Sequence, residues 1–459
     1  MPAGRAGSTY NVLTMKPSIN ALSRAGAPGR TVCGIAIALV VTFLVSSPAP
    51  AQLINGRVIS SLYTWEKFDT VGSARKVTRG YLSGILDVGH GNFSLHTHFQ
   101  AASELKRQLD ELPDYRLYYL YFQQKSIAGF ADLSLGRLPY FAGVGTGTVD
   151  GAQTTLRFVH NTVKLTAYGG VNVPVDMTVK GYGSVDNNFV VGGQVVSTVL
   201  PDMRASLSYM NRRRERTSYW TTRPDPTAEA LPMLIAPPPQ EEEYAGLDVS
   251  YKFNEARFYG RYDYDLNLKK TQRGQAGVRY TFSPTLFATA DYLFRNPRVP
   301  YNSIFSVFEY KSITEYEGGV DYFVTPIFRA FVRGAYVQYT GDGSFRYTAG
   351  IGSENLELRY RGNTGYAGEL STVTLQGAYP LLENRLVPNA SFTYTRYRLD
   401  ETTGAESALA AALGTTLRFI QAVSVDLQGQ WVNNIVYKSD FRFFGKINFW
   451  FSERLNILD

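Results

Sequence analysis

The residues of this 459-residue chain that could do chemistry are charged side chains that alternate with apolar ones. From residue 245 to residue 295 nearly every second position is apolar or aromatic, and the positions between them are polar or charged. Because successive side chains of a strand point to opposite faces, such residues share one polar face. The cations of this pattern, here and further along the chain, are Arg257, Arg261, Arg279, Arg329, Arg333, Arg359, Arg361, Arg442 and Lys446. The acids are Asp248, Asp263, Asp265, Asp291, Glu317, Asp321, Glu357 and Asp426.

The four histidines indicate no catalytic or metal centre. His96 and His98 share a polar face with Ser94 and Gln100, and two imidazoles at i and i+2 can share a metal. A stable zinc site needs three or four ligands, however, so we expect plain polar lining, no metal and no cofactor. A hydrolase needs a histidine paired with Ser, Asp or Asn, and no such set is evident. Phosphate-loop, dinucleotide and haem-attachment motifs are absent from the sequence, and we expect a protein that is not an enzyme.

Residues 212–242 form the longest non-alternating stretch. Arg212, Arg213, Arg214 and Arg216 cluster at its start, Glu241 to Glu243 stand at its end, and the apolar segment LPMLIAPPP lies between. Long loops in compact folds are usually functional or disordered. One hypothesis is that this loop enters a pore mouth and narrows it, with its arginines repelling cations or holding anions. The other is a surface loop whose arginines meet lipopolysaccharide phosphates.

The alternating runs predict a transmembrane β-barrel. They are about nine to twelve residues long, the length that a tilted strand needs to cross a bilayer, whereas strands of soluble sandwiches are shorter. A sheet in lipid must close, because an open edge would leave backbone N–H and C=O groups without partners. Charge is tolerated on the inner face of such a barrel only where water reaches it, so we expect a wet lumen.

Short and long connections alternate along the chain, as they do in an up-and-down barrel. Tight turns are expected near His90-Gly91, Ala128-Gly129, Asn161-Thr162, Pro201-Asp202, Asn254-Glu255, Pro284, Pro326, Ser353-Glu354, Leu382-Glu383 and Gln421-Ala422. Longer connections are expected at about 104–114, 141–149, 172–188, 212–242, 296–311 and 400–406. The pattern predicts an all-β, antiparallel barrel of about 22 strands with both termini periplasmic; the count becomes 20 if residues 344–361 are one loop.

The first 51 residues resemble a secretory signal. Basic Arg24 and Arg30 precede the apolar run from Cys33 to Val45, and Ala49-Pro50-Ala51 fits a cleavage site, with Met1 or Met15 as the start. We expect residues 1–51 to be removed and residues 52–459 to form one barrel domain. Removal takes four basic residues and leaves 42 basic against 39 acidic ones, so the sequence pI of about 9.1 is no argument for a nucleic-acid partner. It also takes Cys33, the only cysteine.

The last alternating run, from Asp440 to Phe451, resembles the C-terminal strand of Gram-negative outer-membrane proteins, which ends in an aromatic residue recognised by the barrel-assembly machinery. Here SERLNILD follows the aromatic residue. GRLPYFAGVGTGTVDG, from Gly136 to Gly151, is similar to strand–loop–strand segments of general porins. The resemblance is to the porin-like superfamily as a whole and covers residues 52–459. It implies a place in the bacterial outer membrane, contact with lipid and lipopolysaccharide, and assembly by that machinery; a homo-oligomer is left open.

Together these features predict a channel for the passive diffusion of small hydrophilic solutes or ions, lined by the charged residues named above. The alternative is a barrel with a plugged lumen. Such a barrel would be a structural or adhesive protein, or a sheath for a partner such as a multihaem electron-transfer protein.

Overall fold

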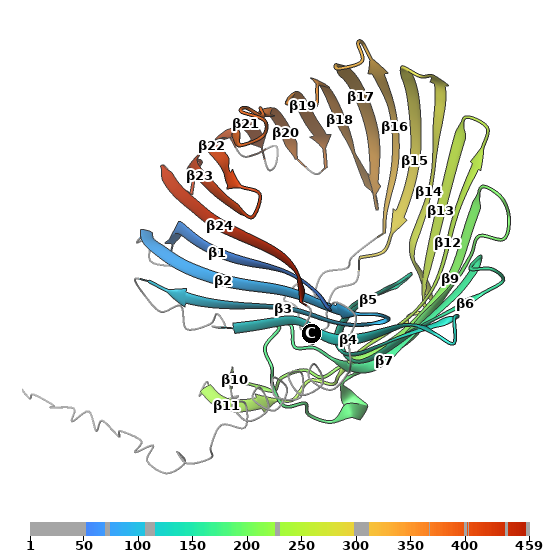
Figure 1. The fold of residues 1–459 in the computed structure, drawn as a ribbon. Helices are drawn as coiled ribbons and strands as arrows, with labels where there is room; N and C mark the ends of the chain where they lie inside the picture. The colour runs from blue at the N-terminus through green and yellow to red at the C-terminus, as the bar shows by residue number, and fades with distance from the viewer. Residues whose placement is uncertain are drawn as a thin grey trace, which may run out of the picture. The chain divides into compact units, whose positions relative to one another are not determined.

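A computed structural model describes residues 52–68, 74–105, 115–224, 230–297, 312–366, 368–398, 402, 404–436 and 439–455. Its main feature is one antiparallel sheet of 22 strands (Figure 1). The strands are β1 (Gln52–Phe68), β2 (Ala74–His90), β3 (Phe93–Glu104), β4 (Tyr115–Ile127), β5 (Ala131–Ala142), β6 (Gly145–Phe158), β7 (Val163–Asn172), β8 (Phe189–Ser197), β9 (Met203–Arg214), β12 (Gln240–Phe253), β13 (Ala256–Asp265), β14 (Lys270–Ser283), β15 (Leu286–Arg295), β16 (Ile313–Phe323), β17 (Arg329–Tyr339), β18 (Asp342–Gly352), β19 (Leu356–Gly365), β20 (Glu369–Ala378), β21 (Leu386–Arg398), β22 (Glu406–Ile420), β23 (Val423–Asn433) and β24 (Asp440–Leu455).

The sheet is a closed barrel. Each strand pairs with its neighbours in chain order, and the first strand pairs with the last from Gln52↔Leu455 to Thr64↔Phe443. Closure gives every strand two partners and leaves no edge, which is the condition for crossing lipid. The expected count of 22 is confirmed, and residues 344–361 contribute the separate strands β18 and β19. Among the described residues no helix is long and apolar enough to cross a membrane.

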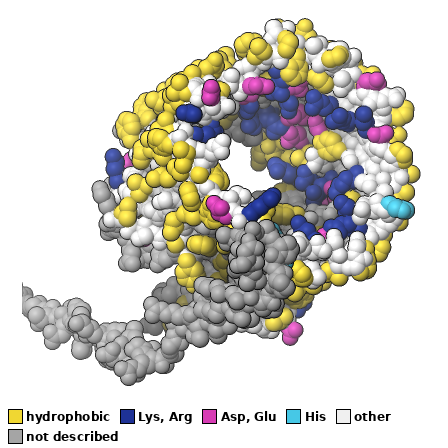
Figure 2. Space-filling view, viewed as in Figure 1, with side chains coloured by type: hydrophobic (Ala, Val, Ile, Leu, Met, Phe, Trp, Pro, Cys, Tyr) yellow, Lys and Arg dark blue, Asp and Glu magenta, His cyan; other side chains and the backbone are white. Residues whose placement is uncertain are grey.

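The two faces of the barrel differ in polarity as the alternation requires. On β24, Phe441, Phe443 and Phe449 are exposed on the outer face, while Asp440 and Asn448 on the inner face are buried. Figure 2 shows the same division around the ring, with hydrophobic side chains outside and Lys, Arg, Asp and Glu gathered inside. Exposed aromatic residues on the outer face are stable only against lipid, so the barrel spans a membrane.

At one end of the barrel, which is called the turn end, every connection between neighbouring strands is short. Its turns lie at the ten places expected from the sequence, from residues 91–92 after β2 to residues 421–422 after β22. Both ends of the described sheet, at Gln52 and Leu455, are also at this end. The long connections lie at the opposite end, called the loop end, together with a few short ones such as residues 340–341 between β17 and β18. The regular alternation of strand direction therefore holds around the whole ring.

Two expected loops are different in the structure. Residues 141–149 are not a long connection, because β5 and β6 are joined by Gly143-Val144 alone. The 212–242 loop is shorter than expected, because β9 continues to Arg214 and β12 begins at Gln240. Between them, β10 (Tyr219–Pro224) and β11 (Ala230–Ile235) form a separate two-stranded sheet. Strands that rise above the bilayer no longer need an apolar face, and the alternation that marks them in the sequence fades there.

The assignment of faces predicts different reactivity at two adjacent residues of β22. Ala412 pairs with Gln430 on the inner face, whereas Leu413 is 70% exposed on the outer face. In a Cys33→Ser chain reconstituted into liposomes, we expect a charged maleimide to modify Ala412→Cys at least roughly tenfold faster than Leu413→Cys, because lipid excludes the reagent. Mass spectrometry measures the modification. Equal rates at both positions would contradict a water-filled lumen enclosed by lipid.

Candidate functional site

The end of the β5–β6 hairpin leaves the barrel wall and lies inside the lumen. β4 pairs with β5 only as far as Leu120↔Arg137, and beyond that point β5 pairs with β6 alone. Figure 1 places β5 within the ring of strands. Residues 138–149, called the inward hairpin here, contact the strands β8 and β9 instead of β4. The inward hairpin is therefore the structure's main intrusion into the lumen among the described residues.

An apolar cluster holds the inward hairpin against the wall. Its Leu138, Tyr140, Ala142 and Val149 are at most 2% exposed and pack on Tyr168, Val190 and Met210 from the inner faces of β7, β8 and β9. The rings of Tyr140 and Tyr168 stack with 4.3 Å between their centroids. The apolar side chains of the wall at these lumen positions are shielded from water only when the hairpin covers them. Their burial therefore stabilises the position of the hairpin inside the lumen.

Three glycines mark the line along which the hairpin bends. Gly136, Gly151 and Gly170 are directly paired across β5, β6 and β7. Gly136 and Gly170 have φ angles of +125° and +155°, and a Cβ on Gly151 would lie 2.1 Å from the carbonyl oxygen of Gly169. Only glycine fits a backbone with such angles and such close approach. This row lets three neighbouring strands turn sharply at one height.

A buried ion pair fixes the root of the hairpin. Arg137 is 5% exposed and donates two hydrogen bonds of 2.8 Å to the two carboxylate oxygens of Asp150. Its Nη1 also donates to the carbonyl oxygens of Leu117, Met177 and Thr178. Bidentate pairing with further carbonyl acceptors satisfies the buried guanidinium, as a charge removed from water requires.

The long connection between β7 and β8 closes the gap that the hairpin leaves in the wall. Where β4 has lost β5 as its partner, the N–H of Leu117 donates to the carbonyl oxygen of Met177 at 2.8 Å. This connection is tied locally by Asp176, which accepts hydrogen bonds from Lys180 and Thr178. These two bonds lower the pKa of Asp176 to about 2, so the carboxylate is ionised throughout the neutral range.

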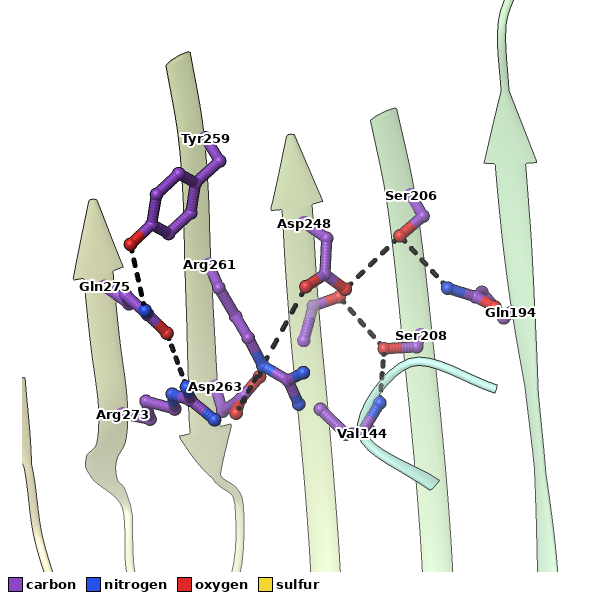
Figure 3. Close-up of polar contacts among 11 residues, drawn as sticks. Val144, Gln194, Ser206, Ser208, Asp248, Tyr259, Arg261, Asp263, Arg273 and Gln275 are labelled. Atoms are coloured by element: carbon purple, nitrogen blue, oxygen red, sulfur yellow. Dashed lines mark hydrogen bonds and ion pairs between the residues drawn. The ribbon is translucent and has the colours of Figure 1, made fainter. Parts of the chain in front are cut away.

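The tip of the inward hairpin meets a group of polar side chains on the neighbouring strands β9, β12 and β13. The N–H of Val144 donates to Ser208 Oγ at 3.1 Å. Ser208 Oγ in turn donates to the carbonyl oxygen of Gly246. Beside this contact, Ser206 donates to Asp248, Asp248 lies 3.8 Å from Arg261, and Arg261 Nε donates to Asp263 at 3.0 Å (Figure 3). The wall residues beside the tip are thus hydrogen-bonded to one another and held in fixed positions.

The inward hairpin carries no charge. Its residues from 138 to 149 are LPYFAGVGTGTV. Phe141 is 78% exposed and lies on the hairpin face away from the buried cluster. The inward hairpin itself therefore adds no charged side chain to the space beside it.

The inner face of β13 to β19 is a wall of arginines and carboxylates, which the space-filling view shows in blue and magenta on the inner side of the ring. Its carboxylates have partners: Asp321 lies 3.6 and 3.5 Å from Arg329 and Arg333, and Glu317 pairs with Arg346. Several of its arginines, by contrast, have no carboxylate partner. Within the described part of the chain, no ion pair is formed by Arg257, Arg273, Arg279, Arg295 or Arg361. The uncompensated charge of this wall is positive.

The remaining lumen candidates from the sequence also share the inner face. Lys446 lies 2.9 Å from Asp426, Arg442 lies 2.6 Å from Asp440, and Arg359 lies 2.5 Å from Glu357. Asp291 accepts a hydrogen bond from Tyr259, and Asp265 accepts one from the N–H of Leu268. Side chains that bond to one another across strands keep the lumen wall polar, and their individual effect on selectivity stays a prediction.

The expected constriction arginines are mostly wall residues. Arg212, Arg213 and Arg214 end the strand β9, and only Arg216 lies in the connection after it. Arg212 pairs with Glu242, and Arg213 pairs with Glu241 at 2.8 Å. The Arg and Glu clusters at the two ends of residues 212–242 are thus neighbours in the ladder between β9 and β12, where opposite charges attract. Figure 1 draws β10 and β11 beside the ring, so the structure gives no support to a constriction by this loop.

His96 has more partners than the sequence indicated. Its Nδ1 lies 2.5 Å from Asp87 Oδ1, and its Nε2 lies 2.8 Å from Ser94 Oγ. Asp, His and Ser in this order are the elements of a hydrolase triad. A hydrolase also needs free N–H donors for an oxyanion, and β3 is paired in ladders on both sides. We therefore interpret this set as fixed polar lining. His98 stacks on Tyr118, with 4.5 Å between the ring centroids.

Two features of the site were missed from the sequence. Arg273 and Arg346 lie on the same inner face as the predicted residues, and the alternation itself could have found them. The inward position of residues 138–149 has a weaker signal, the glycines at 136, 143, 145, 147 and 151. Such spacing fits an ordinary flexible loop equally well.

Comparison with known proteins gives the fold and no closer identity. The class of protein that the chain's own sheet defines is the transmembrane β-barrel. No protein-family model and no curated protein matches the chain. Among solved structures, OccAB4 of Acinetobacter baumannii is 9% identical, with 88% of this chain and 99% of that chain covered and a TM-score of 0.42. The P pilus usher (PapC) translocation pore is 9% identical (87% and 99% covered, TM-score 0.44), and a BenF-like porin from Pseudomonas fluorescens Pf-5 is 8% identical (89% and 100% covered, TM-score 0.40). Likeness at this level carries no functional information.

The buried pair at the root of the hairpin predicts a large effect of one substitution. Asp150→Asn leaves the Arg137 guanidinium, whose side chain is 4% exposed, without its counter-charge. We expect the free energy of unfolding in urea to fall by about 3 kcal/mol, because an unpaired buried charge is costly. The control is Glu369→Gln, which breaks the exposed pair with Arg398 and should cost at most about 1 kcal/mol. Similar losses for both variants would show that the Arg137–Asp150 pair has no special role.

Proposed function

We propose that this protein is an outer-membrane channel for the passive diffusion of small hydrophilic solutes, with a preference for anions. The observation that carries the proposal is the closed barrel whose inner face is charged and whose outer face is apolar. A ring of 22 strands is too wide for wall side chains to fill. Figure 2 shows an opening between the described side chains on the inner side of the ring.

The inward hairpin supplies the constriction of the proposed channel. It lies over the inner faces of β7 to β9 and leaves the arginine wall of β13 to β19 uncovered. A solute therefore passes between an uncharged hairpin and a wall with unpaired arginines. Such a wall attracts anions and repels cations, and water in a narrow passage screens it less than bulk salt solution does. This arrangement supports an open channel better than a plugged structural barrel or a sheath around a partner protein.

The same proposal includes the location. Export by a cleaved signal over residues 1–51, which lie outside the described residues, would deliver the chain to the outer membrane with both termini in the periplasm. The turn end would then face the periplasm and the loop end the outside, as in barrels of this kind. Contacts with lipopolysaccharide and the barrel-assembly machinery, and a homo-oligomer, belong to this proposal as well.

Removing the inward hairpin should widen the channel. In a variant that joins Leu138 to Val149 by Asn-Gly, a favourable two-residue turn, we expect the single-channel conductance in planar bilayers to rise roughly twofold, because the cross-section increases. A heat-modifiable band on gels shows that the variant has folded.

The matched control deletes residues 217–238, which contain β10 and β11 and lie outside the inward hairpin. We expect its conductance to equal that of the unaltered chain. The assignment of the constriction would be reversed if the control opened the channel and the hairpin deletion did not.

Ion selectivity should depend on the unpaired wall arginines. Arg257 and Arg279 face each other in register on β13 and β14. In a salt gradient we expect a reversal potential whose sign indicates anion selectivity. In the double variant Arg257→Gln/Arg279→Gln we expect the anion-to-cation permeability ratio to be roughly twofold lower than in the unaltered chain. The difference between the two proteins should shrink at high salt, because salt screens the charges. Arg396→Gln, on the outer face of β21, should leave the ratio unchanged. A cation-selective parent channel would refute the anion preference.

A further inference from the structure

A concave site on the lumen wall lies apart from the hairpin. It has a volume of about 560 Å³ and is lined by residues of β15 to β20, with four arginines and one glutamate among them. The residues that matter here are Arg295, Ser344, Arg346, Arg359, Arg361 and Thr372, which are called the arginine niche. A volume of this size is in the range of small-molecule sites.

The niche has cationic charge without a partner. Arg346 is neutralised by Glu315 and Glu317, and Arg359 pairs with Glu357 at 2.5 Å. Arg361 lies between these two arginines, flanked in register by Thr348 and Thr372, and no ion pair of Arg361 is found in the described ranges. The same holds for Arg295 at the side of the niche. Two guanidiniums are thus free to receive an anion.

A buried hydroxyl without a partner points to a ligand as well. Ser344 is 1% exposed, and its Oγ has no hydrogen-bond partner among the described residues. Buried hydroxyls are nearly always hydrogen-bonded, and an unsatisfied one calls for a ligand or an ordered water. Ser344 lines the niche together with the arginines, so a donor to an anionic oxygen is already in place there.

The niche lies on the part of the lumen wall that faces the inward hairpin. In the ring of 22 strands, β18 is eleven strands from β5 in either direction, so the niche is opposite the inward hairpin (Figure 1). Arg346 lies near the start of β18, and Arg361 lies near the end of β19. Both positions are in the half of the lumen towards the loop end. A solute that enters from that side reaches the niche on the wall that the hairpin leaves open.

We propose that the arginine niche is a binding site for small organic solutes that carry two oxyanion charges, either two carboxylates or one phosphate. This inference rests on the proposed channel and specifies its solute class. The planar guanidinium of Arg361, with that of Arg295 at the side of the niche, suits carboxylate and phosphate oxygens, and Ser344 and Thr372 are further donors. A single chloride would occupy little of the volume and leave most of these donors unused.

The test measures block of the chloride current by organic anions in planar bilayers containing the full purified chain. We expect succinate and glycerol 3-phosphate to block at concentrations at least roughly tenfold below those of acetate, because two charges engage the site. Block by only one of the two would assign the carboxylate or the phosphate as the preferred group and would also support the niche. Block by neither beyond that of acetate would overturn it.

Two variants locate the site. Arg361→Gln should raise the half-blocking concentration of the dianions about tenfold, and Ser344→Ala should raise it by a smaller factor. Arg279→Gln removes another unpaired lumen arginine outside the niche, so it should lower anion selectivity yet leave the half-blocking concentration unchanged. Equal effects of Arg279→Gln and Arg361→Gln on block would mean a general field and no discrete site.

Titration calorimetry of the same purified chain in detergent separates the two proposals. If succinate or glycerol 3-phosphate binds and Arg361→Gln weakens that binding, the niche is supported even if no channel steps are seen. In that case only the proposed channel function would be refuted. Channel steps without any dianion binding or block would leave the channel standing and overturn the niche.

Discussion

The structure depends on one constraint, that each backbone N–H and C=O group inside a bilayer needs a partner within the protein. Closure of the sheet between β1 and β24 meets it for the ring as a whole. The constraint also explains the unusual region around β4. The hairpin of β5 and β6 can enter the lumen only if something replaces it, and the connection after β7 does so through the bond from Leu117 to Met177. The intrusion and its replacement form one structural unit.

The stability of that unit has favourable contributions from packing and an ion pair, and an unfavourable one from chain entropy. Apolar burial of Tyr140 and Leu138 against the wall favours the folded-in hairpin, and the Arg137–Asp150 pair fixes its root. The three-glycine row removes the steric cost of the bend, although glycine also loses more chain entropy on folding than other residues do. A bend built from backbone geometry and packing needs no charge near the passage.

Sequence alternation predicted the barrel well because its cause is local. The side chains of residues i and i+2 share a face whatever the strand pairs with, so Arg257, Arg333 and Lys446 could be placed on the inner face without knowing a single neighbour. The inward hairpin could not be predicted in this way. Residues 138–149 look like the end of a strand followed by a glycine-rich loop. Their departure from the wall depends on Tyr168, Val190 and Met210, which lie further along the sequence. The same limit hid the pairing of Arg212 with Glu242, because the 29 residues between them make the charged stretch look like a loop.

In the proposed channel, the neutrality of the inward hairpin separates two properties of the passage. Its aperture would be set by one short segment and its glycine row, whereas its electrical character would be set by the separate strands β13 to β19. Substitutions in one segment therefore leave the other property nearly untouched. Substitutions on the wall could then change the charge preference of such a barrel without altering its size limit. Substitutions in the hairpin could change the size limit without altering the charge preference.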